Sequence, residues 1–222
     1  LGYLMNYNAY DLLALNAIVK AEVLDYLGPS IGIGKEADVY EGVTPDEKTL
    51  AVKFHRLGRT SFRDTRRKRE YLADRRHTSW LYQSRLAAEI EYEALQKMYK
   101  EGVQVPEPIY HNRHTIVMQY IESTQLSDII SLEEPEIFLD EILENMKKAY
   151  KAGIIHSDLS EYNVLIDEKT DVWIIDWPQF ISSDHPNAEE ILERDIGNIA
   201  YFFERKHGTK MSREEAIIFV KN

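Results

Sequence analysis

The stretch Ile155–Trp177, which reads I-H-S-D-L-S-E-Y-N-V-L-I-D-E-K-T-D-V-W-I-I-D-W, is predicted to organise the fold. Two short apolar runs flank a polar turn at 167–171, and this pattern predicts a β-hairpin. Asp158 and Asn163 precede the first strand, and Asp176 ends the second. Because a hairpin brings its outer ends together, Asn163 and Asp176 are expected to be neighbours, with Asp158 close by. Oxygen donors placed in this way suit Mg²⁺, which shares hard oxygen ligands with substrate phosphates.

The spacing H-x-D-L-x-x-x-N, from His156 to Asn163, matches the catalytic-loop pattern of kinases. In that pattern the Asp accepts the proton of the acceptor hydroxyl and the Asn holds metal. Asp176 would then take the metal-binding role of the D-F-G aspartate, although Trp177 and Pro178 follow it here. The alternative is that these are ordinary polar residues at strand ends, since Asp and Asn are common in turns. The kinase interpretation is favoured only if the other parts of a nucleotide-binding site are also found in the sequence.

Composition sets broad limits. A chain of 222 residues is long enough for one large domain or two small lobes, and 44% hydrophobic and 29% charged residues are ordinary for a globular protein. No apolar run approaches the ~20 residues that span a bilayer, and no signal peptide is visible, so no membrane partner is expected. The lack of cysteine excludes disulfides and fits a cytoplasmic location. Because the chain opens with Leu1, we expect an N-terminal portion to be missing from it.

Charge is distributed unevenly. The net charge of −11 argues against a nucleic-acid partner, but Arg56–Arg85 has ten Lys or Arg against three Asp or Glu. This local excess of +7 leaves −18 on the rest of the chain. Such asymmetry is typical of a basic segment that contacts phosphates beside an acidic body. The alternative is a solvated loop.

Upstream, I31-G-I-G-K-E-A-D-V-Y40 contains two glycines between alternating apolar residues. Lacking a Cβ, Gly32 and Gly34 let the backbone approach a bulky anion closely. The kinase pattern is G-x-G-x-x-G-x-V; here Ala37 stands at the third glycine and Val39 matches the valine. A plain hairpin turn is the alternative.

A lysine lies within the apolar strand that follows, in A51-V-K-F54. A bare ammonium is costly there unless it is paired, and a phosphate or a carboxylate would supply the pairing. The helix predicted over 84–99 carries Glu91, which we take as the carboxylate partner of Lys53. Glu89 and Glu93 are the alternatives.

A strand predicted over 115–121 would be the hinge of a kinase, where backbone groups of Gln119–Ile121 bind adenine and Met118 lies behind the base. A plain core strand is the alternative. Helices are also predicted over 10–19, 22–27, 126–153 and 188–203, and an extended connector over 103–108. Asp195, in the last helix, would brace the catalytic loop through backbone N–H groups, unless it is solvated.

Taken together, these motifs occur in the order that a kinase fold requires, and the chain resembles the RIO family of atypical protein kinases, in its Rio2 branch. The resemblance spans Tyr10–Phe203 and rests on the following stretches: G34-K-E-A-D-V39, H55-R-L-G-R-T-S-F-R63, S79-W-L-Y82, I155-H-S-D-L159 with Asn163, I175-D-W-P-Q179, and H185-P-N-A188 with Arg194-Asp195.

The resemblance implies an α+β, reduced two-lobed kinase-like fold with a remnant of an N-terminal winged helix. Residues 1–28 would be the tail of that domain or a linker, 29–121 the N-lobe with a basic loop at 55–85, and 122–222 the C-lobe. It also implies ATP with Mg²⁺ or Mn²⁺, Ser/Thr phosphorylation and ATPase activity. The cellular role would be late maturation of the small ribosomal subunit, by a monomer that contacts rRNA and ribosomal proteins.

The implied catalytic residues are Lys53, Asp158 and Asp176, and the implied metal ligands are Asn163 and Asp176. Asp176 could also receive the phosphoryl group. The basic residues implied to bind RNA are Arg66, Arg67, Lys68 and Arg69. The implied ATP-binding residues are Ile31, Gly32, Gly34, Lys35, Glu36, Val39, Lys53, Glu91, Met118, Gln119, Tyr120 and Ile121.

Two departures from ordinary protein kinases bear on mechanism. Ser157 replaces the Arg of H-R-D, which removes the usual receptor for a phosphorylated activation loop. Ser160 stands where many kinases carry a lysine, which leaves one cation fewer for the migrating phosphoryl group. No long activation segment follows. We therefore hypothesise a switch driven by ATP hydrolysis. The alternatives are a small-molecule phosphotransferase of the aminoglycoside or choline kinase type and a non-catalytic, ATP-binding assembly factor.

Overall fold

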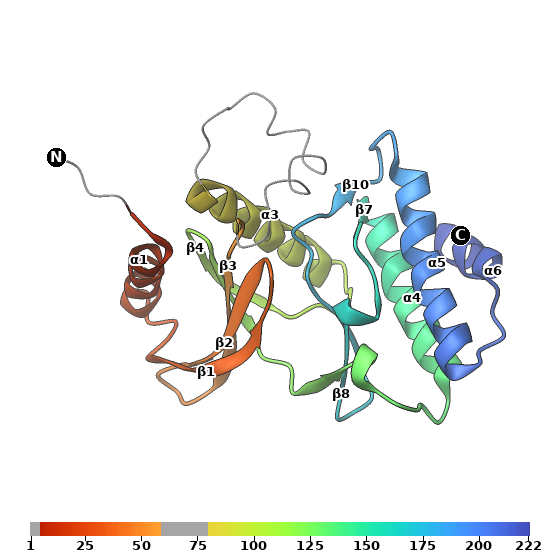
Figure 1. The fold of residues 1–222 in the computed structure, drawn as a ribbon, viewed down its shortest axis with the longest axis horizontal. Helices are drawn as coiled ribbons and strands as arrows, with labels where there is room; N and C mark the ends of the chain where they lie inside the picture. The colour runs from red at the N-terminus through yellow and green to blue at the C-terminus, as the bar shows by residue number, and fades with distance from the viewer. Residues whose placement is uncertain (1–4, 59–79) are drawn as a thin grey trace. The chain divides into compact units, whose positions relative to one another are not determined.

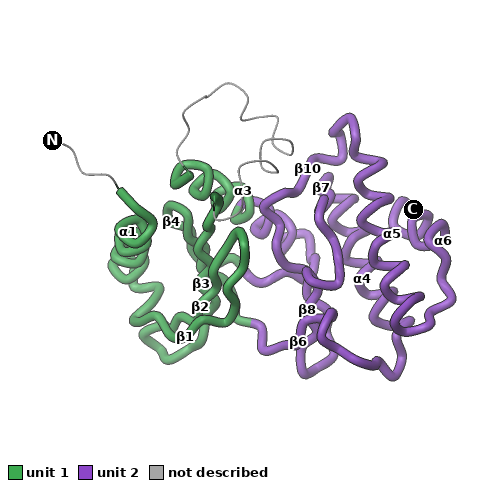
Figure 2. The backbone as a smooth tube through the Cα atoms, viewed as in Figure 1, with its two compact units in different colours: residues 1–92, 108–120 green, residues 93–107, 121–222 purple. Residues whose placement is uncertain are grey.

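The computed structural model describes residues 5–58 and 80–222 (Figure 1). The chain divides into two compact units, which are described separately (Figure 2). Unit 1 comprises residues 1–92 and 108–120, and unit 2 comprises residues 93–107 and 121–222. Arg66, Arg67, Lys68 and Arg69, with most of the basic segment, lie outside the described residues.

Unit 1 is built on a five-stranded antiparallel sheet with the order β1-β2-β3-β5-β4. Its central strand carries Lys53, which lies opposite Val39 on one neighbouring strand and Ile116 on the other. The position of Lys53 is therefore set by two ladders of backbone hydrogen bonds. The strands are β1 (Tyr26–Ile33), β2 (Ala37–Val43), β3 (Thr49–His55), β4 (Pro108–Asn112) and β5 (Thr115–Gln119).

Two helices accompany this sheet, α1 (Tyr7–Lys20) and the first part of α3 (Trp80–Lys100). Asn6 caps α1 by accepting a hydrogen bond from the Ala9 N–H. Ile18 of α1 packs in the core cluster of the unit, whose other members are Leu24, Val52, Phe54 and Val117.

The short helix predicted over 22–27 is wrong. The N–H groups of Glu22 and Val23 bond back to carbonyls of α1, and Glu22 takes a left-handed φ of 56°, so the helix ends there. Leu24 then enters the core, and the Asp25 N–H bonds to Val43 O, which begins the sheet. Burial of Leu24 in this cluster is a tertiary effect that overrides local helical propensity.

Unit 2 is mainly helical, with two small antiparallel sheets. The predicted hairpin is confirmed: Val164 lies opposite Ile174, and Ile166 opposite Val172. The helices are the end of α3, α4 (Pro135–Lys151), α5 (Ala188–His207) and α6 (Arg213–Lys221), with 3₁₀ turns η2 (Leu126–Asp128) and η3 (Glu161–Asn163). The strands are β6 (Ser123–Gln125), β7 (Ile154–Ile155), β8 (Val164–Asp167), β9 (Val172–Ile174) and β10 (Ile181–Ser182).

The helix predicted over 126–153 is wrong in its first part. Only a 3₁₀ turn forms at its start, and α4 begins at Pro135, which stands at the first helical position. Proline suits that position because its missing N–H would have no partner within the helix. Strand β4 and helix α6 were not predicted; a capping box between Ser212 and Glu215 begins α6.

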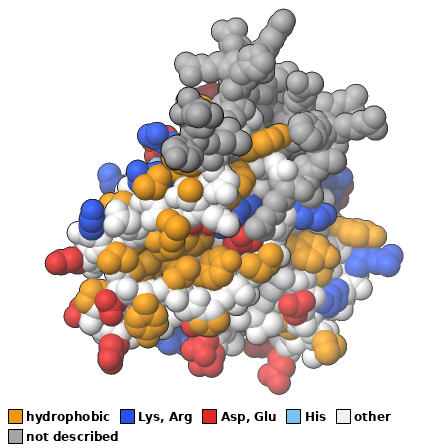
Figure 3. Space-filling view, turned by 60° about the vertical axis from the view of Figure 1, so that its left-hand side comes forward, with side chains coloured by type: hydrophobic (Ala, Val, Ile, Leu, Met, Phe, Trp, Pro, Cys, Tyr) orange, Lys and Arg blue, Asp and Glu red, His pale blue; other side chains and the backbone are white. Residues whose placement is uncertain are grey.

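Hydrophobic side chains are exposed among charged ones on the face that Figure 3 shows. Within residues 5–58 and 80–222, no helix combines the length and the apolar character needed to cross a membrane. Several large apolar side chains of α1 and β1 are exposed: Leu12, Leu13, Val19, Tyr26, Ile31 and Ile33.

Candidate active site

The most buried charged pair among the described residues of unit 1 joins Lys53 on strand β3 to Glu91 on helix α3. Lys53 is 6% exposed and Glu91 is 1% exposed, and Lys53 Nζ donates a hydrogen bond of 2.6 Å to Glu91 Oε1. Glu89 and Glu93 are exposed on the same helix. The structure thus identifies Glu91 as the carboxylate that neutralises Lys53, which the sequence left open among three glutamates.

A third member of this cluster, His55, was not predicted. It lies two residues beyond Lys53 on β3, so both side chains point to the same face of the sheet. Its Nε2 atom is 2.9 Å from Glu91 Oε2, and the imidazole is buried. Burial alone would raise the pKa of Glu91, but Lys53 and His55 lower it to about 2. The carboxylate is therefore ionised at neutral pH, held between two nitrogen groups.

The glycine-rich segment forms a tight turn between β1 and β2, as the hairpin alternative predicted. The Gly34 N–H bonds to Ala37 O at 2.8 Å, and a Cβ on Gly34 would lie 3.1 Å from that oxygen, so this position is crowded. Ile31, Gly32 and Lys35 are exposed. The turn leaves its backbone accessible, and the contacts with ATP predicted for it, and for Glu36 and Val39, stay predictions.

The predicted hinge residues occupy the end of β5 and the residues after it. Met118 pairs with Ala51 and Gln119 with Leu50, while Tyr120 is the last residue of unit 1 and Ile121 begins the second segment of unit 2. All four hinge side chains are half-buried. Binding of adenine here stays a prediction.

In unit 2, the catalytic-loop motif lies between β7 and β8. The Asp158 side chain is exposed, and Asn163 Nδ2 donates to Asp158 O at 2.9 Å. This bond fixes the orientation of the amide, because it commits the nitrogen and leaves Oδ1 as the acceptor. Asn163 can therefore offer an oxygen to a cation.

Asp176 is held beside this loop by its neighbour in sequence. The Ile175 N–H donates to Asn163 O at 3.0 Å, and the buried His156 bonds to Ile175 O at 2.9 Å. These bonds confirm the expected pairing of Asn163 with the end of the second strand. Asp176 itself adopts a left-handed φ of 67°, which is uncommon for a non-glycine residue. Such conformations cluster at functional sites.

Asp195 braces the catalytic loop from helix α5, as predicted. Its Oδ2 accepts the Ser157 N–H at 2.6 Å, and Ser157 has a left-handed φ of 66°. Arg194 bonds to both Ser157 O and Asp195 Oδ1, and Ser157 Oγ donates to Gln179 O. Burial raises the pKa of Asp195, and Arg194 opposes that rise. Ser157, the strained residue before Asp158, is thus held by hydrogen bonds at its N–H, its carbonyl and its side chain.

The donor set of unit 2 fits a hard divalent cation. Asn163 Oδ1 and the Asp176 carboxylate are both oxygen ligands of the type that Mg²⁺ prefers. Within the part of the chain that the structure describes, no cluster of three or more His, Cys, Asp or Glu could hold a metal ion. Mg²⁺ usually completes a set of one or two protein oxygens with phosphate and water.

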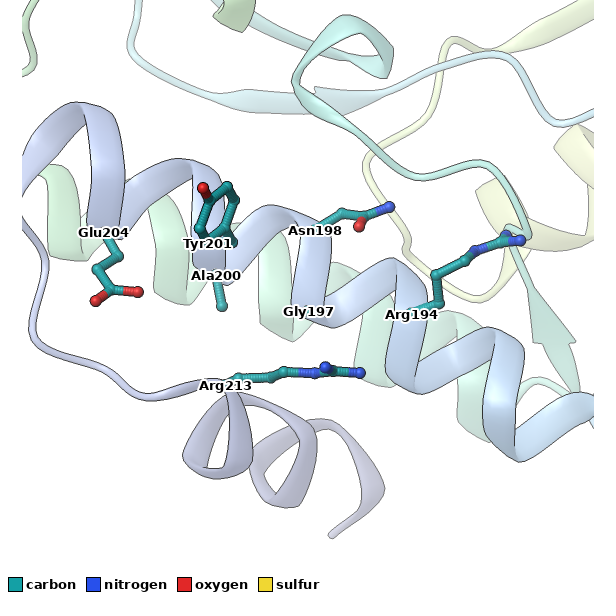
Figure 4. A pocket seen from close by; sticks show the side chains of 7 residues that line it. All are labelled: Arg194, Gly197, Asn198, Ala200, Tyr201, Glu204 and Arg213. Atoms are coloured by element: carbon teal, nitrogen blue, oxygen red, sulfur yellow. The ribbon is translucent and has the colours of Figure 1, made fainter.

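A groove of about 320 Å³ lies along α5, beside the start of α6 (Figure 4). Arg213 crosses one wall, where a Cβ on Gly197 would be only 2.7 Å from Arg213 Nε. A glycine inside a helix costs about 1 kcal/mol, and here it makes room for that side chain. The groove is lined by Arg194, Gly197, Asn198, Ala200, Tyr201, Glu204 and Arg213, and by none of the predicted catalytic residues.

These features define a protein-kinase-like phosphotransferase. Unit 1 supplies a β-sheet with a buried Lys–Glu pair, and unit 2 supplies an H-x-D-x-x-x-x-N loop followed by I-D. The family model described as RIO domain matches residues 38–216. The serine/threonine-protein kinase Rio2 of Methanocaldococcus jannaschii is 46% identical over 209 residues, which cover 92% of this chain and 77% of that protein. The chain belongs to the RIO family of atypical serine/threonine protein kinases, in its Rio2 branch.

Other similar proteins are also Rio2 kinases. The Dictyostelium discoideum kinase rio2 is 40% identical, over 92% of this chain but 39% of that protein. The crystal structure of the Rio2 kinase from Chaetomium thermophilum matches with a TM-score of 0.82 and 36% identity, over 98% of this chain and 70% of that one. A second structure from the same organism, its complex with ADP/Mg²⁺ and phosphoaspartate, matches with a TM-score of 0.81 and 37% identity, over 98% and 68%.

Proposed function

We propose that this chain binds ATP with Mg²⁺ and transfers the γ-phosphoryl group, acting as an atypical Ser/Thr kinase and ATPase. The observation that carries the proposal is the buried Lys53–Glu91 pair. Two opposite charges removed from water rarely add stability over an apolar pair of similar size, so a structural role explains them poorly. A lysine held in place by a glutamate is instead what a site that neutralises phosphate requires.

In this proposal, Lys53 contacts the α- and β-phosphates and Glu91 holds it in position. Asp158 accepts the proton of a Ser or Thr hydroxyl, whose oxygen then bonds to the γ-phosphorus as the bond to the ADP oxygen breaks. Asn163 and Asp176 would hold Mg²⁺, which supplies neutralisation of phosphate charge when it is bound. Mn²⁺ would suit the same oxygen donors.

We propose further that Asp176 accepts the phosphoryl group itself. Its carboxylate oxygen would bond to the γ-phosphorus, ADP would leave, and water would later release phosphate. Two observations support this step: the left-handed backbone at Asp176, and the phosphoaspartate complex of the similar Chaetomium kinase. Ser157 and Ser160, in place of the usual arginine and lysine, support slow turnover, as expected of an ATP-driven switch.

The test is incubation of the full chain with γ-labelled ATP and Mg²⁺, comparing the wild type with Asp176→Asn. Label on protein that hydroxylamine removes, and that the variant lacks, would support the aspartyl-phosphate. Hydroxylamine-stable label on Ser or Thr alone would contradict that step and leave the kinase activity. If neither label nor free phosphate forms, the chain is an ATP-binding assembly factor. Family membership disfavours the small-molecule phosphotransferase.

The cellular role proposed is late maturation of the small ribosomal subunit, by a monomer in the cytoplasm, with the basic segment contacting rRNA. The charge excess of Arg56–Arg85 supports the RNA contact. Neutralising Arg66, Arg67, Lys68 and Arg69 together should weaken RNA binding and flatten its dependence on salt, because fewer counterions are released. An unchanged salt slope would contradict the contact.

A further inference from the structure

Helix α1 carries no catalytic motif, yet it reaches the most heavily paired cation in unit 1. Arg56 is 6% exposed, and its guanidinium bonds to both carboxylate oxygens of Asp11, at 2.6 and 2.9 Å. A bidentate pair of this kind is strong and fixes geometry. The Tyr7 ring lies 5.3 Å from the guanidinium carbon, and Tyr7 Oη donates to Leu57 O. The helix is thus attached to the end of β3 through a buried charge.

The same arginine holds the glycine-rich turn from the other side. Its Nε donates to Asp38 Oδ2 at 2.9 Å, and its backbone N–H donates to Glu36 O at 2.6 Å. Glu36 is the last residue of the turn and Asp38 the second residue of β2. One residue at the end of β3 therefore ties the end of this turn to a carboxylate on α1.

His114 closes the network. It is fully buried, its Nε2 is 2.8 Å from Asp11 Oδ1, and its ring stacks on Tyr10 of α1 at 4.6 Å. Its Nδ1 has no hydrogen-bond partner among the described residues. Nε2 also lies 3.2 Å from Arg56 Nη1. Protonation would bury an N–H at Nδ1 without an acceptor and place a positive charge beside that guanidinium, so a neutral ring fits the site. With His114 neutral, Arg56 is the cation that compensates the charge of Asp11, and it also pairs with Asp38.

We propose that α1 is a positioning element of the nucleotide site, in which Asp11, acting through Arg56, sets the geometry of the glycine-rich turn and thereby the affinity for ATP. The expected effect on ATP affinity rests on the proposed function. The effect of Asp11 on the geometry of the glycine-rich turn does not. Without Asp11, the guanidinium has one carboxylate in place of two, and the turn loses the fixed arginine that orients Asp38.

The experiment compares Asp11→Asn in the full chain with Asp25→Asn, which removes an exposed carboxylate from the same unit. Asparagine keeps the shape but places an NH₂ group against the donors of Arg56. Affinity for the non-hydrolysable analogue AMP-PNP with Mg²⁺ is measured well below the unfolding midpoint. We expect Asp11→Asn to weaken it roughly tenfold, within the usual range for coupled sites, and Asp11→Glu to restore part of the loss.

A second readout needs no nucleotide. Hydrogen exchange is followed at the amides of Gly34 and Arg56, whose bonds to Ala37 O and Glu36 O define the turn, with Ser157 in unit 2 as the reference. Asp11→Asn should accelerate exchange at the first two amides and leave Ser157 unchanged. If it lowers only the unfolding midpoint, with exchange and affinity as in Asp25→Asn, α1 is a structural support and the inference fails. If exchange accelerates but the wild type binds no nucleotide, the proposed function fails instead.

Discussion

The substitution Glu91→Gln tests the contribution of the Lys53–Glu91 pair to the stability of unit 1. The amide keeps the size of the side chain but removes its charge, and this takes away the carboxylate that lies 2.6 Å from the buried ammonium of Lys53. Breaking a buried pair in this way costs about 3–5 kcal/mol.

The pKa of Glu91 gives a second estimate of how much its carboxylate stabilises the folded chain. The pKa of Glu91 falls from 4.5 to about 2, despite the burial that opposes this shift, because Lys53 and His55 favour the charged form. At 1.36 kcal/mol per unit, this corresponds to about 3 kcal/mol of stability at neutral pH. For a carboxyl with a depressed pKa, that stability is present above pH 4.5 and is lost as the pH falls towards 2.

The assay is thermal unfolding of the wild type, Glu91→Gln and Glu89→Gln at pH 7. Glu89 is on the same helix and exposed, so it controls for the loss of one negative charge. We expect Glu91→Gln to lower the unfolding midpoint by roughly 10 °C and Glu89→Gln to change it little. Equal midpoints for the two variants would refute the assignment of Glu91 as the neutralising partner.

Three further predictions concern the catalytic loop and the α1 network. Asp158→Ala should abolish the transfer of label from ATP to Ser or Thr with nucleotide affinity nearly intact, because Asp158 acts on the hydroxyl acceptor; a variant fully active in that transfer would remove it from the mechanism. Asp195→Ala should lower the turnover number more than it raises the KM for ATP, because Ser157 loses the acceptor of its N–H; a change in KM alone would contradict this. Burial lowers the pKa of His114, against the raising effect of Asp11. The unfolded chain therefore binds more protons just below pH 6.5, so the free energy of unfolding should fall as the pH drops below that value, and His114→Gln should flatten this slope between pH 7.5 and 5.5.

Much of the site was predictable because its signals are local. The hairpin from Val164 to Ile174 follows from two apolar runs around a polar turn, and hairpin geometry alone places Asn163 beside the end of the second strand. The burial of Lys53 follows in the same way from the apolar residues on either side of it. These inferences need no knowledge of the rest of the chain.

Other features depend on residues far apart in sequence. Leu24 is part of a locally helical pattern, but its place in a core with Val52 draws the chain into a strand. Pro135, not the apolar residues before it, decides where α4 begins. In both cases the sequence pattern was compatible with a helix, and packing or backbone chemistry excluded it.

The sequence by itself predicted most of the elements and the residues proposed to carry the chemistry, because each motif is a run of neighbouring residues with its own turn or strand preference. Only the tertiary structure decided the partners. Lys53 pairs with Glu91, and not with Glu89 or Glu93, across 38 positions of sequence. His55 contacts the same carboxylate across 36 positions, and Asp11 is the counterion of Arg56 across 45. A buried charge takes whichever opposite charge the packing brings within reach, and that is a property of the fold.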